Sequence, residues 1–265
     1  MIGAIIGDIA GSPYEFKGIK HKDFDLFEDR SRFTDDTAMT IAVADALMSL
    51  EGGESDEEIR LALAFSMKRW GRRYLNAGYG RKFREWLESD DLEPYYSYGN
   101  GSAMRVSSTG WLYDDIDTVR HMARLSAEVT HNHPEGIKGA EAVASAIFLV
   151  RKGADRDEVK EYLEENFDYD LGLSLDDIRP GYSFDVTCMG SVPESIICYL
   201  ECDSFEDAVR NAVSLGGDSD TMACMAGAIA EAEYGVPEEL VDEAEAFLNE
   251  DMLDVLDRFR DLTEC

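Results

Sequence analysis

The sequence predicts an all-α fold, built as one domain over residues 1–265. Apolar residues recur at helical spacing along nearly the whole chain, no strand-like alternation persists, and helix start signals recur. The chain has no linker rich in proline and serine, and no internal repeat of fixed period. A chain of 265 residues is also long enough to bury a substantial core.

About a dozen helices are expected, separated by glycine-rich or aromatic loops. In chain order, the predicted helices are 2–11, 36–50, 55–73, 80–88, 116–128, 135–152, 156–166, 191–202, 205–215, 220–234, 238–249 and 251–261. The long loops between them are 12–34, 89–110 and 167–190. The first helix carries glycines four residues apart, at positions 3, 7 and 11, a spacing that suits close helix packing beneath a site.

Several helix boundaries follow from residues that are typical of helix starts. Ser55 and Glu58 have the spacing of a capping box, in which each side chain binds the backbone N–H of the other. Pro134 suits a first helical turn, where its missing N–H costs nothing, and Pro237 precedes two glutamates that favour a helix N-terminus. The predicted helices at 55–73, 135–152 and 238–249 therefore begin near these residues.

The chain is strongly acidic, with 56 acidic against 25 basic residues and a formal net charge of -31. Such a surface repels phosphate backbones and anionic lipids, so neither nucleic acid nor membrane is expected as a main partner. Much of the excess lies on solvated helix faces, for example 51–58 and 155–165, where it serves solubility. A monomer is expected.

The five cysteines form no Cys-x-x-Cys pair and no even framework for disulfides. They are Cys188, Cys198, Cys202, Cys224 and Cys265. The N-terminal segment is apolar, but it lacks a basic region and reaches Asp8 too soon for a signal peptide. No apolar run approaches transmembrane length. A reducing, cytoplasmic setting is therefore predicted.

Two acidic clusters, far apart in the sequence, each open an apolar helical segment. The first is Thr34-Asp35-Asp36-Thr37, and the second is Gly216-Gly217-Asp218-Ser219-Asp220-Thr221. Carboxylates and hydroxyls at this density are the ligands that Mg²⁺ and Mn²⁺ prefer. If the fold brings the clusters together, they form one oxygen-rich site able to hold two metal ions.

A simpler interpretation is that each cluster only caps its helix. Thr, Asp and Ser are favoured N-cap residues, and acids in the first turn complement the helix dipole. However, a cap needs one side-chain acceptor, whereas each cluster supplies two closely spaced carboxylates. Neighbouring carboxylates repel each other unless a cation neutralises them. The doubled pattern therefore favours a metal site.

Two further segments carry residues that suit a ligand. Segment 95–105 combines aromatic residues with Gly99-Asn100-Gly101-Ser102, where glycines let backbone amides approach a ligand; a tight turn is the alternative. His131 and His133 lie just before the helix at 135–152. No third nitrogen or sulfur ligand has suitable local spacing for zinc, so substrate contact or helix capping is expected instead.

No signature of nucleophilic catalysis is present. The sequence has no Gly-x-Ser-x-Gly elbow, no cysteine paired locally with a histidine, and neither a GxGxxG nor a Walker motif. Glu15 follows the first predicted helix closely. A lone loop glutamate is usually only solvated, so its position near the other segments is what makes it a candidate.

Taken together, these segments resemble the ADP-ribosylglycohydrolase family, which includes dinitrogenase-reductase-activating glycohydrolases and ADP-ribosyl-acceptor hydrolases. The matching segments follow the family's order and span residues 3 to about 235. They are Gly3-x3-Gly7-Asp8-x2-Gly11-x3-Glu15, Phe33-Thr34-Asp35-Asp36-Thr37, Gly99-Asn100-Gly101-Ser102-Ala103-Met104-Arg105, Thr130-His131-x-His133-Pro134 and Gly216-Gly217-Asp218-Ser219-Asp220-Thr221. The joint match is highly specific, whereas each motif alone is weak.

The resemblance implies a compact all-α orthogonal bundle with a dinuclear Mg²⁺ or Mn²⁺ centre in a cleft. The implied metal ligands are Thr34, Asp35, Asp36, Asp218, Asp220 and Thr221, with Asp220 the candidate to bridge both ions. The implied substrate contacts are Glu15, Gly99, Asn100, Gly101, Ser102 and His133. Asp36 and Glu15 are the candidates for the general acid and base. The chain is short for the family, so loops at the substrate rim are expected to be trimmed.

The implied activity is hydrolysis of the glycosidic bond that joins ADP-ribose to an acceptor. The acceptor is a modified arginine or serine on a protein, or a small conjugate such as O-acetyl-ADP-ribose. The partner is therefore an ADP-ribosylated protein or an ADP-ribose conjugate. Two alternatives stay open: a dinuclear-metal nucleotide or phosphoester hydrolase, and a non-catalytic ADP-ribose-binding relative. The intact acidic clusters argue against the second alternative.

Overall fold

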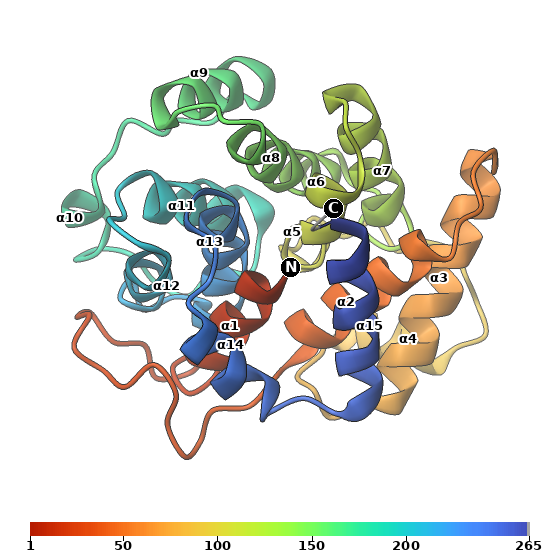
Figure 1. Cartoon of the computed structure of the whole chain (residues 1–265), viewed down its shortest axis with the longest axis horizontal. Helices are drawn as coiled ribbons and strands as arrows, with labels where there is room; N and C mark the ends of the chain where they lie inside the picture. The colour runs from red at the N-terminus through yellow and green to blue at the C-terminus, as the bar shows by residue number, and fades with distance from the viewer. Residues whose placement is uncertain (264–265) are drawn as a thin grey trace.

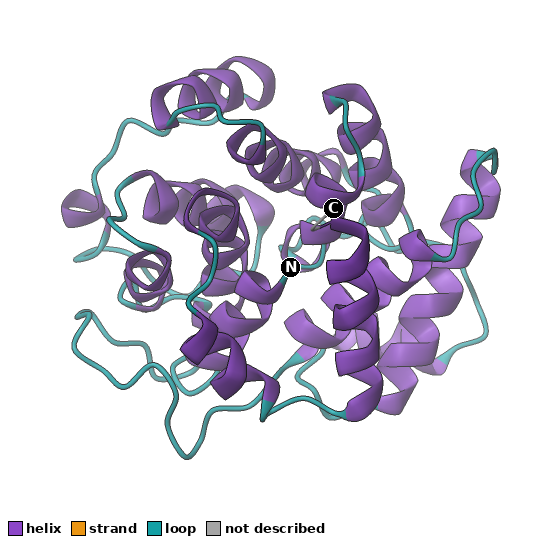
Figure 2. Cartoon of the chain, viewed as in Figure 1, coloured by secondary structure: helices purple, strands orange, loops and turns teal. Residues whose placement is uncertain are grey.

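The computed structural model describes residues 1–263, and every regular element within them is a helix (Figure 2). The all-α prediction is confirmed. The helices are α1 Ile2–Gly11, α2 Asp35–Met48, α3 Asp56–Arg73, α4 Arg81–Glu88, α5 Gly101–Met104, α6 Ser107–Leu112, α7 Ile116–Glu128, α8 Pro134–Arg151, α9 Arg156–Phe167, α10 Leu175–Ile178, α11 Cys188–Leu200, α12 Phe205–Val213, α13 Ser219–Tyr234, α14 Glu238–Glu245 and α15 Glu250–Thr263. Among these residues, β pairing is limited to one antiparallel bridge between Gly99 and Thr187.

Helices α1 and α13 make the most extensive helix–helix contact in the described chain, and α8, α11 and α12 pack around α13 (Figure 1). Every residue of α1 is buried. A Cβ on Gly7 would overlap the carbonyl oxygen of Ala223, and a Cβ on Gly11 would lie 2.5 Å from the Cα of Asp220. The glycine spacing seen in the sequence therefore brings the backbones of α1 and α13 together, as expected.

The predicted helix starts are largely confirmed. Ser55 and Glu58 form both bonds of the capping box before α3. Pro134 is the first residue of α8, and His133 caps that helix by accepting a hydrogen bond from the Glu135 N–H. Thr34 caps α2 through its side chain. The cap interpretation of the first acidic cluster is therefore true for Thr34, but it leaves the two following carboxylates unexplained.

The helices predicted from the sequence do not include three short ones, and some predicted helix ends differ from those in the structure. Segment 89–110, expected as a loop, contains α5 and most of α6, and segment 167–190 contains α10. The shortest of these helices have four residues, too few to show a helical period. Helix α11 begins at Cys188 rather than 191 because the Thr187 hydroxyl accepts a hydrogen bond from the Gly190 N–H. Helix α14 ends at Glu245, earlier than expected.

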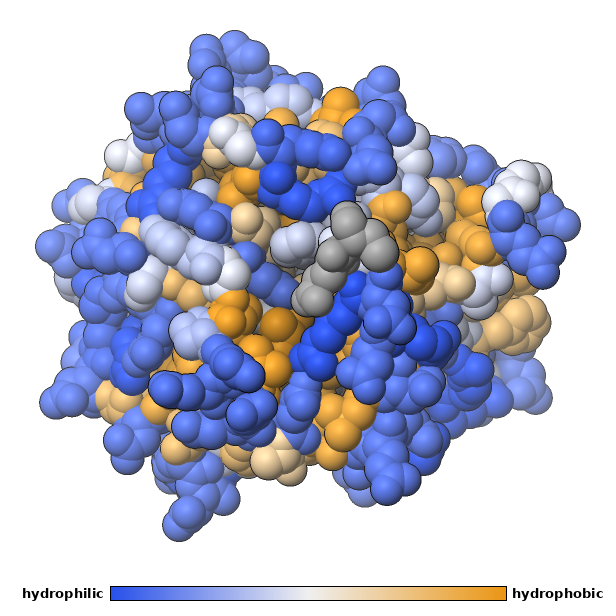
Figure 3. All heavy atoms as spheres, in the orientation of Figure 1, coloured by the Kyte–Doolittle hydropathy of each residue, from blue (hydrophilic) through white to orange (hydrophobic). Residues whose placement is uncertain are grey.

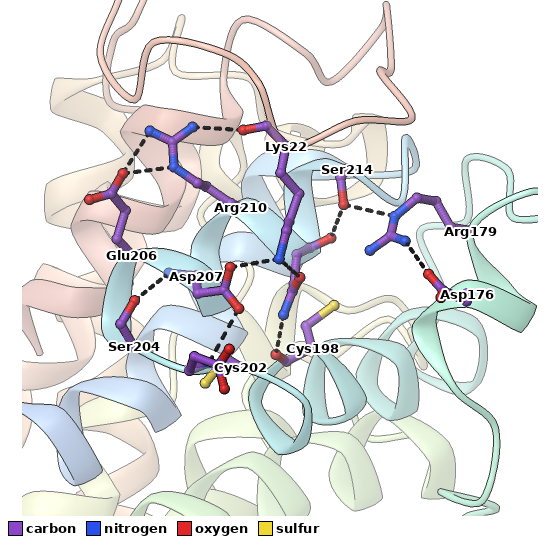
Figure 4. Close-up of polar contacts among 12 residues, drawn as sticks. Lys22, Asp176, Arg179, Cys198, Cys202, Ser204, Glu206, Asp207, Arg210 and Ser214 are labelled. Carbon is purple, nitrogen blue, oxygen red and sulfur yellow. Dashed lines mark hydrogen bonds and ion pairs between the residues drawn. The ribbon is translucent and has the colours of Figure 1, made fainter.

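The loop at 12–34 is irregular, as predicted, but it is anchored to helix α12 (Figure 4). The Lys22 ammonium lies 2.6 Å from a carboxylate oxygen of Asp207 and donates to the Asn211 side chain at 3.0 Å. Arg210 donates to the backbone carbonyls of Lys22 and Phe24, at 2.9 and 2.6 Å. These bonds fix the middle of the loop, whose first residues include Glu15.

Hydrophilic residues cover most of the face shown in Figure 3, in keeping with the acidic composition. The described helices include none that is long and apolar enough to cross a membrane. The cysteines at 188, 198, 202 and 224 are buried free thiols, as the absence of a disulfide framework predicted. Cys265 lies outside the described residues.

Candidate metal centre and active site

Asp8 of α1 anchors the first acidic cluster. Its carboxylate is fully buried and accepts hydrogen bonds from the backbone N–H of Thr34 at 2.8 Å and of Thr37 at 3.0 Å. The hydroxyls of the same two threonines donate to it at 2.7 and 2.5 Å. Four donors therefore fix Asp8 against the N-terminus of α2, and this network sets the direction in which Asp36 projects.

The two acidic clusters meet, although they lie far apart in the chain. The Thr221 hydroxyl donates to a carboxylate oxygen of Asp36 at 3.2 Å. On the other side of the second cluster, the Asn100 amide donates to Asp218 at 2.7 Å. The close approach of α1 to α13 places Asp220 beside the end of α1. The starts of α2, α5 and α13 thus converge on one point.

Two groups of carboxylates have the spacing of a metal site. Oxygens of Asp8, Asp36 and Asp220 lie within 4.8 Å of one another, and so do oxygens of Glu15, Asp218 and Asp220. Asp220 belongs to both groups. One oxygen of Asp36 is buried without a hydrogen-bond partner among the described residues. The donor set is all oxygen and leaves a lone pair unsatisfied, so it fits a hard divalent cation.

Electrostatics also favour a cation here. Burial, followed by repulsion from neighbouring carboxylates, raises the pKa of Asp35, Asp36 and Asp220 well above the usual range of an aspartate. Burial, with a smaller contribution from the charge of Asp218, raises the pKa of Glu15 to about 7. Within residues 1–263, no lysine or arginine forms an ion pair with any of these four groups. A metal ion would supply the missing positive charge.

The acidic cluster opens into a cavity of about 480 Å³. Most of the side chains and backbone positions predicted for the site line this cavity. They are Glu15, Asp35, Asp36, Gly99, Asn100, Gly101, Asp218, Asp220 and Thr221. Phe16, Tyr95, Phe184 and Val186 add apolar surface to its wall. The segments identified separately in the sequence are therefore brought together by the fold.

Three predicted residues do not line the cavity. Thr34 is buried beneath it, where its hydroxyl binds Asp8. The Ser102 hydroxyl is buried and donates to the Gly136 carbonyl at 2.7 Å. His133 caps α8, and its ring lies edge-on between Tyr96 and Tyr98, with centroid distances of 4.8 and 5.3 Å.

The histidine that does line the cavity is His131. It is buried, and its Nδ1 lies 2.7 Å from the Thr130 hydroxyl. Its Nε2 faces Gly101, where a Cβ would lie 3.1 Å away. Burial, together with the nearby Arg105 charge, keeps the pKa of His131 well below its usual value, so the ring is neutral at pH 7. The spacing of the two histidines gave no means of choosing between them.

Asp8 belongs to the first of the sequence motifs, but residue type and spacing alone do not place it in the site. The signal was present, because it is the one charged residue in the otherwise apolar segment 2–11. A charge in the middle of a buried helix requires partners. Which partners it has depends on the packing of α1 against α2, which the local sequence does not reveal.

The fold and site define an all-helical protein with an acidic cavity able to hold a metal ion. The sequence model of the ADP-ribosylglycohydrolase family matches residues 1–264, and the chain belongs to this family. It is therefore a glycohydrolase enzyme of the kind that acts on ADP-ribosyl bonds.

Individual relatives agree with this assignment. The chain is 30% identical to the ADP-ribosylhydrolase ARH3 of Bos taurus, over 96% of this chain and 89% of the relative. The human ARH3 is also 30% identical, over 96% of this chain and 90% of the relative. The ADP-ribosylarginine hydrolase Tri1 of Pseudomonas putida is 26% identical, over 89% and 70%.

A solved structure described as an ADP-ribosylglycohydrolase-related protein complex has the same fold, with a TM-score of 0.72 at 20% identity, covering 99% of this chain and 95% of that one. The expected family fold is thus confirmed. The alignment to bovine ARH3 is 332 positions long, against 265 residues in this chain, so the relative carries insertions that this chain lacks. This agrees with the expectation that the chain is short for its family.

Proposed function

We propose that the enzyme hydrolyses the glycosidic bond between ADP-ribose and an acceptor and releases ADP-ribose. The acceptor is a modified arginine or serine on a protein, or a small conjugate such as O-acetyl-ADP-ribose. The observation that carries the proposal is the junction of the two acidic clusters in one cavity, through Thr221 and Asp36. Relatives named as an ADP-ribosylhydrolase and as an ADP-ribosylarginine hydrolase support this bond as the target.

The proposed cofactor is a pair of Mg²⁺ or Mn²⁺ ions. The proposed ligands are Thr34, Asp35, Asp36, Asp218, Asp220 and Thr221, and the place of Asp220 in both carboxylate groups supports a bridging role. When bound, two such ions supply Lewis acidity that polarises the hydroxyls of the distal ribose and an attacking water. Asp8 supports the ligands from beneath by fixing Thr34 at the start of α2.

The proposed diphosphate site is the wall formed by Gly99, Asn100, Gly101 and Ser102. The first three of these residues line the cavity, and glycines there allow backbone amides to approach a ligand closely. Asn100 also orients Asp218 through its amide. We propose His133 as a substrate contact at the rim of this wall and His131 as a neutral one inside it. The flat apolar side chains of Phe16, Tyr95 and Phe184 offer surfaces for the adenine ring.

Glu15 and Asp36 are the proposed general acid and base. Cleavage of the ribose C1 bond passes through an oxocarbenium-like transition state, so the leaving group needs a proton and the water must lose one. Glu15 lines the cavity with a pKa raised to about 7, so it can hold or release a proton near neutral pH. Asp36 projects into the same cavity from α2, opposite Thr221.

Release of ADP-ribose by single variants tests the proposal. Purified protein with Mg²⁺ or Mn²⁺ is given arginine-linked, serine-linked and O-acetyl ADP-ribose. We expect Asp36→Asn and Asp218→Asn each to lower kcat/KM by about a hundredfold or more, the scale of removing a charge-stabilising group. Each should also weaken Mg²⁺ binding measured by calorimetry, because each removes a ligand charge.

Asp203→Asn is the matched control, since Asp203 is exposed and lies outside the cavity. Full activity in Asp36→Asn or Asp218→Asn, or full activity in excess chelator, would contradict the metal centre. Release of free phosphate without ADP-ribose would instead identify a phosphoester hydrolase.

We further propose a cytoplasmic monomer that folds as one domain over residues 1–265 and does not use nucleic acid as its main partner. The free thiols of the four described cysteines support a reducing setting. The net charge of -31 supports the exclusion of nucleic acid.

A further inference from the structure

Helix α4 presents an unusual N-terminus to the catalytic cavity. Its N-cap is Gly80, which offers no side-chain cap, and its first turn contains no acidic residue. Instead the first two residues are Arg81 and Lys82, although cations oppose the positive end of a helix dipole. Both residues are exposed and line the cavity. Neither forms an ion pair or side-chain hydrogen bond within residues 1–263.

The other end of α4 is stabilised in the usual way. The buried Lys68 of α3 donates to the backbone carbonyls of Trp86 and Ser89, and Arg72 of α3 donates to the carbonyl of Leu87 at 2.7 Å. These cations complement the negative end of the helix. The helix is therefore held by its C-terminus and its packing, and its uncompensated positive end is left facing the cavity.

A buried arginine lines the same cavity and also lacks a counter-charge. Arg105 is 0% exposed, and it donates through Nη2 to the Ser126 carbonyl and the Thr130 hydroxyl, but its Nε has no partner among the described residues. Its guanidinium lies 5.9 Å from the ring centroid of Phe83 on α4. One unpartnered buried donor and two unpaired cations therefore line the same cavity, which points to an anionic ligand there.

The position of α4 indicates which part of the substrate this ligand belongs to. The segment just before α4 lies against the first acidic cluster. The Asp35 N–H donates to the Ala77 carbonyl at 3.0 Å, and a Cβ on Gly78 would lie 3.0 Å from an Asp35 carboxylate oxygen. The proposed diphosphate wall instead contacts the second cluster, through Asn100 and Asp218. The start of α4 therefore lies beside the first acidic cluster, whereas the proposed diphosphate wall lies beside the second.

We propose that Arg81 and Lys82 form an acceptor subsite that selects ADP-ribose conjugates carrying negative charge next to the scissile bond. This inference rests on the proposed function, because it assigns the distal ribose to the metal centre and the diphosphate to the Gly99–Gly101 wall. The acceptor then leaves on the side of Asp35 and α4. Serine-linked ADP-ribose flanked by acidic residues fits such a subsite, whereas a cationic arginine acceptor or a lysine-rich peptide is repelled by it.

The subsite acts against the field of the whole molecule. A protein of net charge -31 attracts cationic peptides and repels anionic ones at long range. Two unpaired cations at the cavity therefore reverse the preference locally, where the acceptor is bound. Their effect is separable from the overall charge by comparing variants of equal net charge.

The test uses three serine-ADP-ribosylated peptides that differ only in the two residues flanking the serine: both Glu, both Gln or both Lys. The measured quantity is the ratio of kcat/KM for ADP-ribose release from the Glu peptide to that from the Lys peptide, with saturating Mg²⁺ at low ionic strength. In Arg81→Glu/Lys82→Glu we expect this ratio to fall about tenfold or more relative to the unmodified enzyme, as for reversal of two charge pairs.

The matched control is Arg84→Glu/Lys160→Glu, which changes the net charge equally at residues that do not line the cavity. Its ratio should fall far less than in Arg81→Glu/Lys82→Glu, because neither Arg84 nor Lys160 lines the cavity and both act on the acceptor only through the general field of the protein. Arg81→Gln/Lys82→Gln removes the two charges without reversing them, so it should give an intermediate ratio. This variant replaces the charge-reversed one in the test if the charge-reversed protein fails to show a normal thermal transition.

The outcomes separate this inference from the proposed function. An equal fall for all three peptides would mean that Arg81 and Lys82 bind the diphosphate, which all three share, and would overturn the subsite. An unchanged ratio in both Arg81/Lys82 variants would overturn it as well. Release from arginine-linked substrate with none from serine peptides would overturn the subsite alone. Release of ADP-ribose from no conjugate would overturn the proposed function itself.

Discussion

At the residue scale, the chemistry of the site depends on carboxylates held where water cannot solvate them. Asp8, Asp36 and Asp220 are each at most 3% exposed, and burial is the first cause of the raised pKa of each. Hydrogen bonds from Thr34 and Thr37 offset part of this effect for Asp8. The remaining unfavourable charge favours cation binding at this cluster, because a bound ion would relieve repulsion that the fold imposes.

These shifts predict that the metal-free protein loses stability as pH rises. A carboxyl group whose pKa is raised by folding binds more protons in the folded state than in the unfolded state. Its contribution to the free energy of unfolding is therefore fully present below its unfolded pKa and is lost as the pH rises through its folded pKa. For Glu15 the folded pKa is about 7. In chelator, we therefore expect the free energy of unfolding, measured with urea, to fall as the pH rises from about 4.5, the usual pKa of a glutamate, to about 7.

One histidine opposes this trend. Burial lowers the pKa of His131 from 6.5, so that residue destabilises the fold as the pH falls below about 6.5. It is one group against several carboxyl groups whose pKa is raised, so the net trend is still a fall in stability with rising pH. Saturating Mg²⁺ should raise stability most at the alkaline end, because the ion binds the folded state alone and binds best where the carboxyl groups are ionised. Equal urea midpoints across the window in chelator would contradict the assigned electrostatics.

At the element scale, the site depends on the contact between α1 and α13. The absence of side chains at Gly7 and Gly11 lets the two backbones touch, and this contact places Asp8 and Asp220 within reach of a shared ion. The α2 start is then fixed to α1 through Asp8 and Thr37. Small residues in the first helix therefore determine the spacing of carboxylates that belong to three different helices.

Adding a methyl group at this contact should damage both the fold and the site. A Cβ on Gly7 overlaps the backbone of Ala223, which cannot move aside as a flexible side chain could. We expect Gly7→Ala to lower the free energy of unfolding by about 1–3 kcal/mol, the usual cost of overpacking. The same variant should weaken Mg²⁺ binding, measured by calorimetry, because α1 and α13 separate.

Gly181→Ala is the control, since a Cβ at Gly181 meets no atom within 4 Å and needs no left-handed backbone. A Gly7→Ala protein as stable as this control, with unchanged Mg²⁺ affinity, would show that the helix contact does not set the geometry of the ligands.

At the scale of the whole molecule, the dominant property is the net charge of -31. Like charges over a small globule repel each other and disfavour the compact state. The exposed ion pairs that oppose this repulsion, such as Arg84 with Glu88, are each worth little. The protein thus combines a repulsive surface with a site that concentrates further negative charge in its interior.

Monovalent salt should therefore stabilise the protein. Raising KCl from about 20 mM to 0.5 M shortens the Debye length severalfold and screens the surface repulsion. We expect the Tm, measured by circular dichroism, to rise with salt in the metal-free and Mg²⁺-loaded forms alike. A Tm that falls with salt in both forms would mean that surface ion pairs outweigh the net repulsion.

Much of this protein could be predicted from its sequence, because the relevant signals are local. Helical periodicity predicted the fold class, Ser55 and Glu58 marked a helix start, and the acidic clusters marked the carboxylates that the fold brings together. The short helices α5 and α10 were missed, since four residues carry no period.

The sequence by itself determined which residues are chemically suited to hold a cation and which segments form helices, because both depend on residue type and near-neighbour spacing. Only the tertiary structure decided which of them meet. It joined Thr221 to Asp36, placed His131 rather than His133 inside the cavity, and turned the start of α4 toward it. Such long-range contacts are set by helix packing, here by backbones that touch at glycines, and packing is a property of the whole chain.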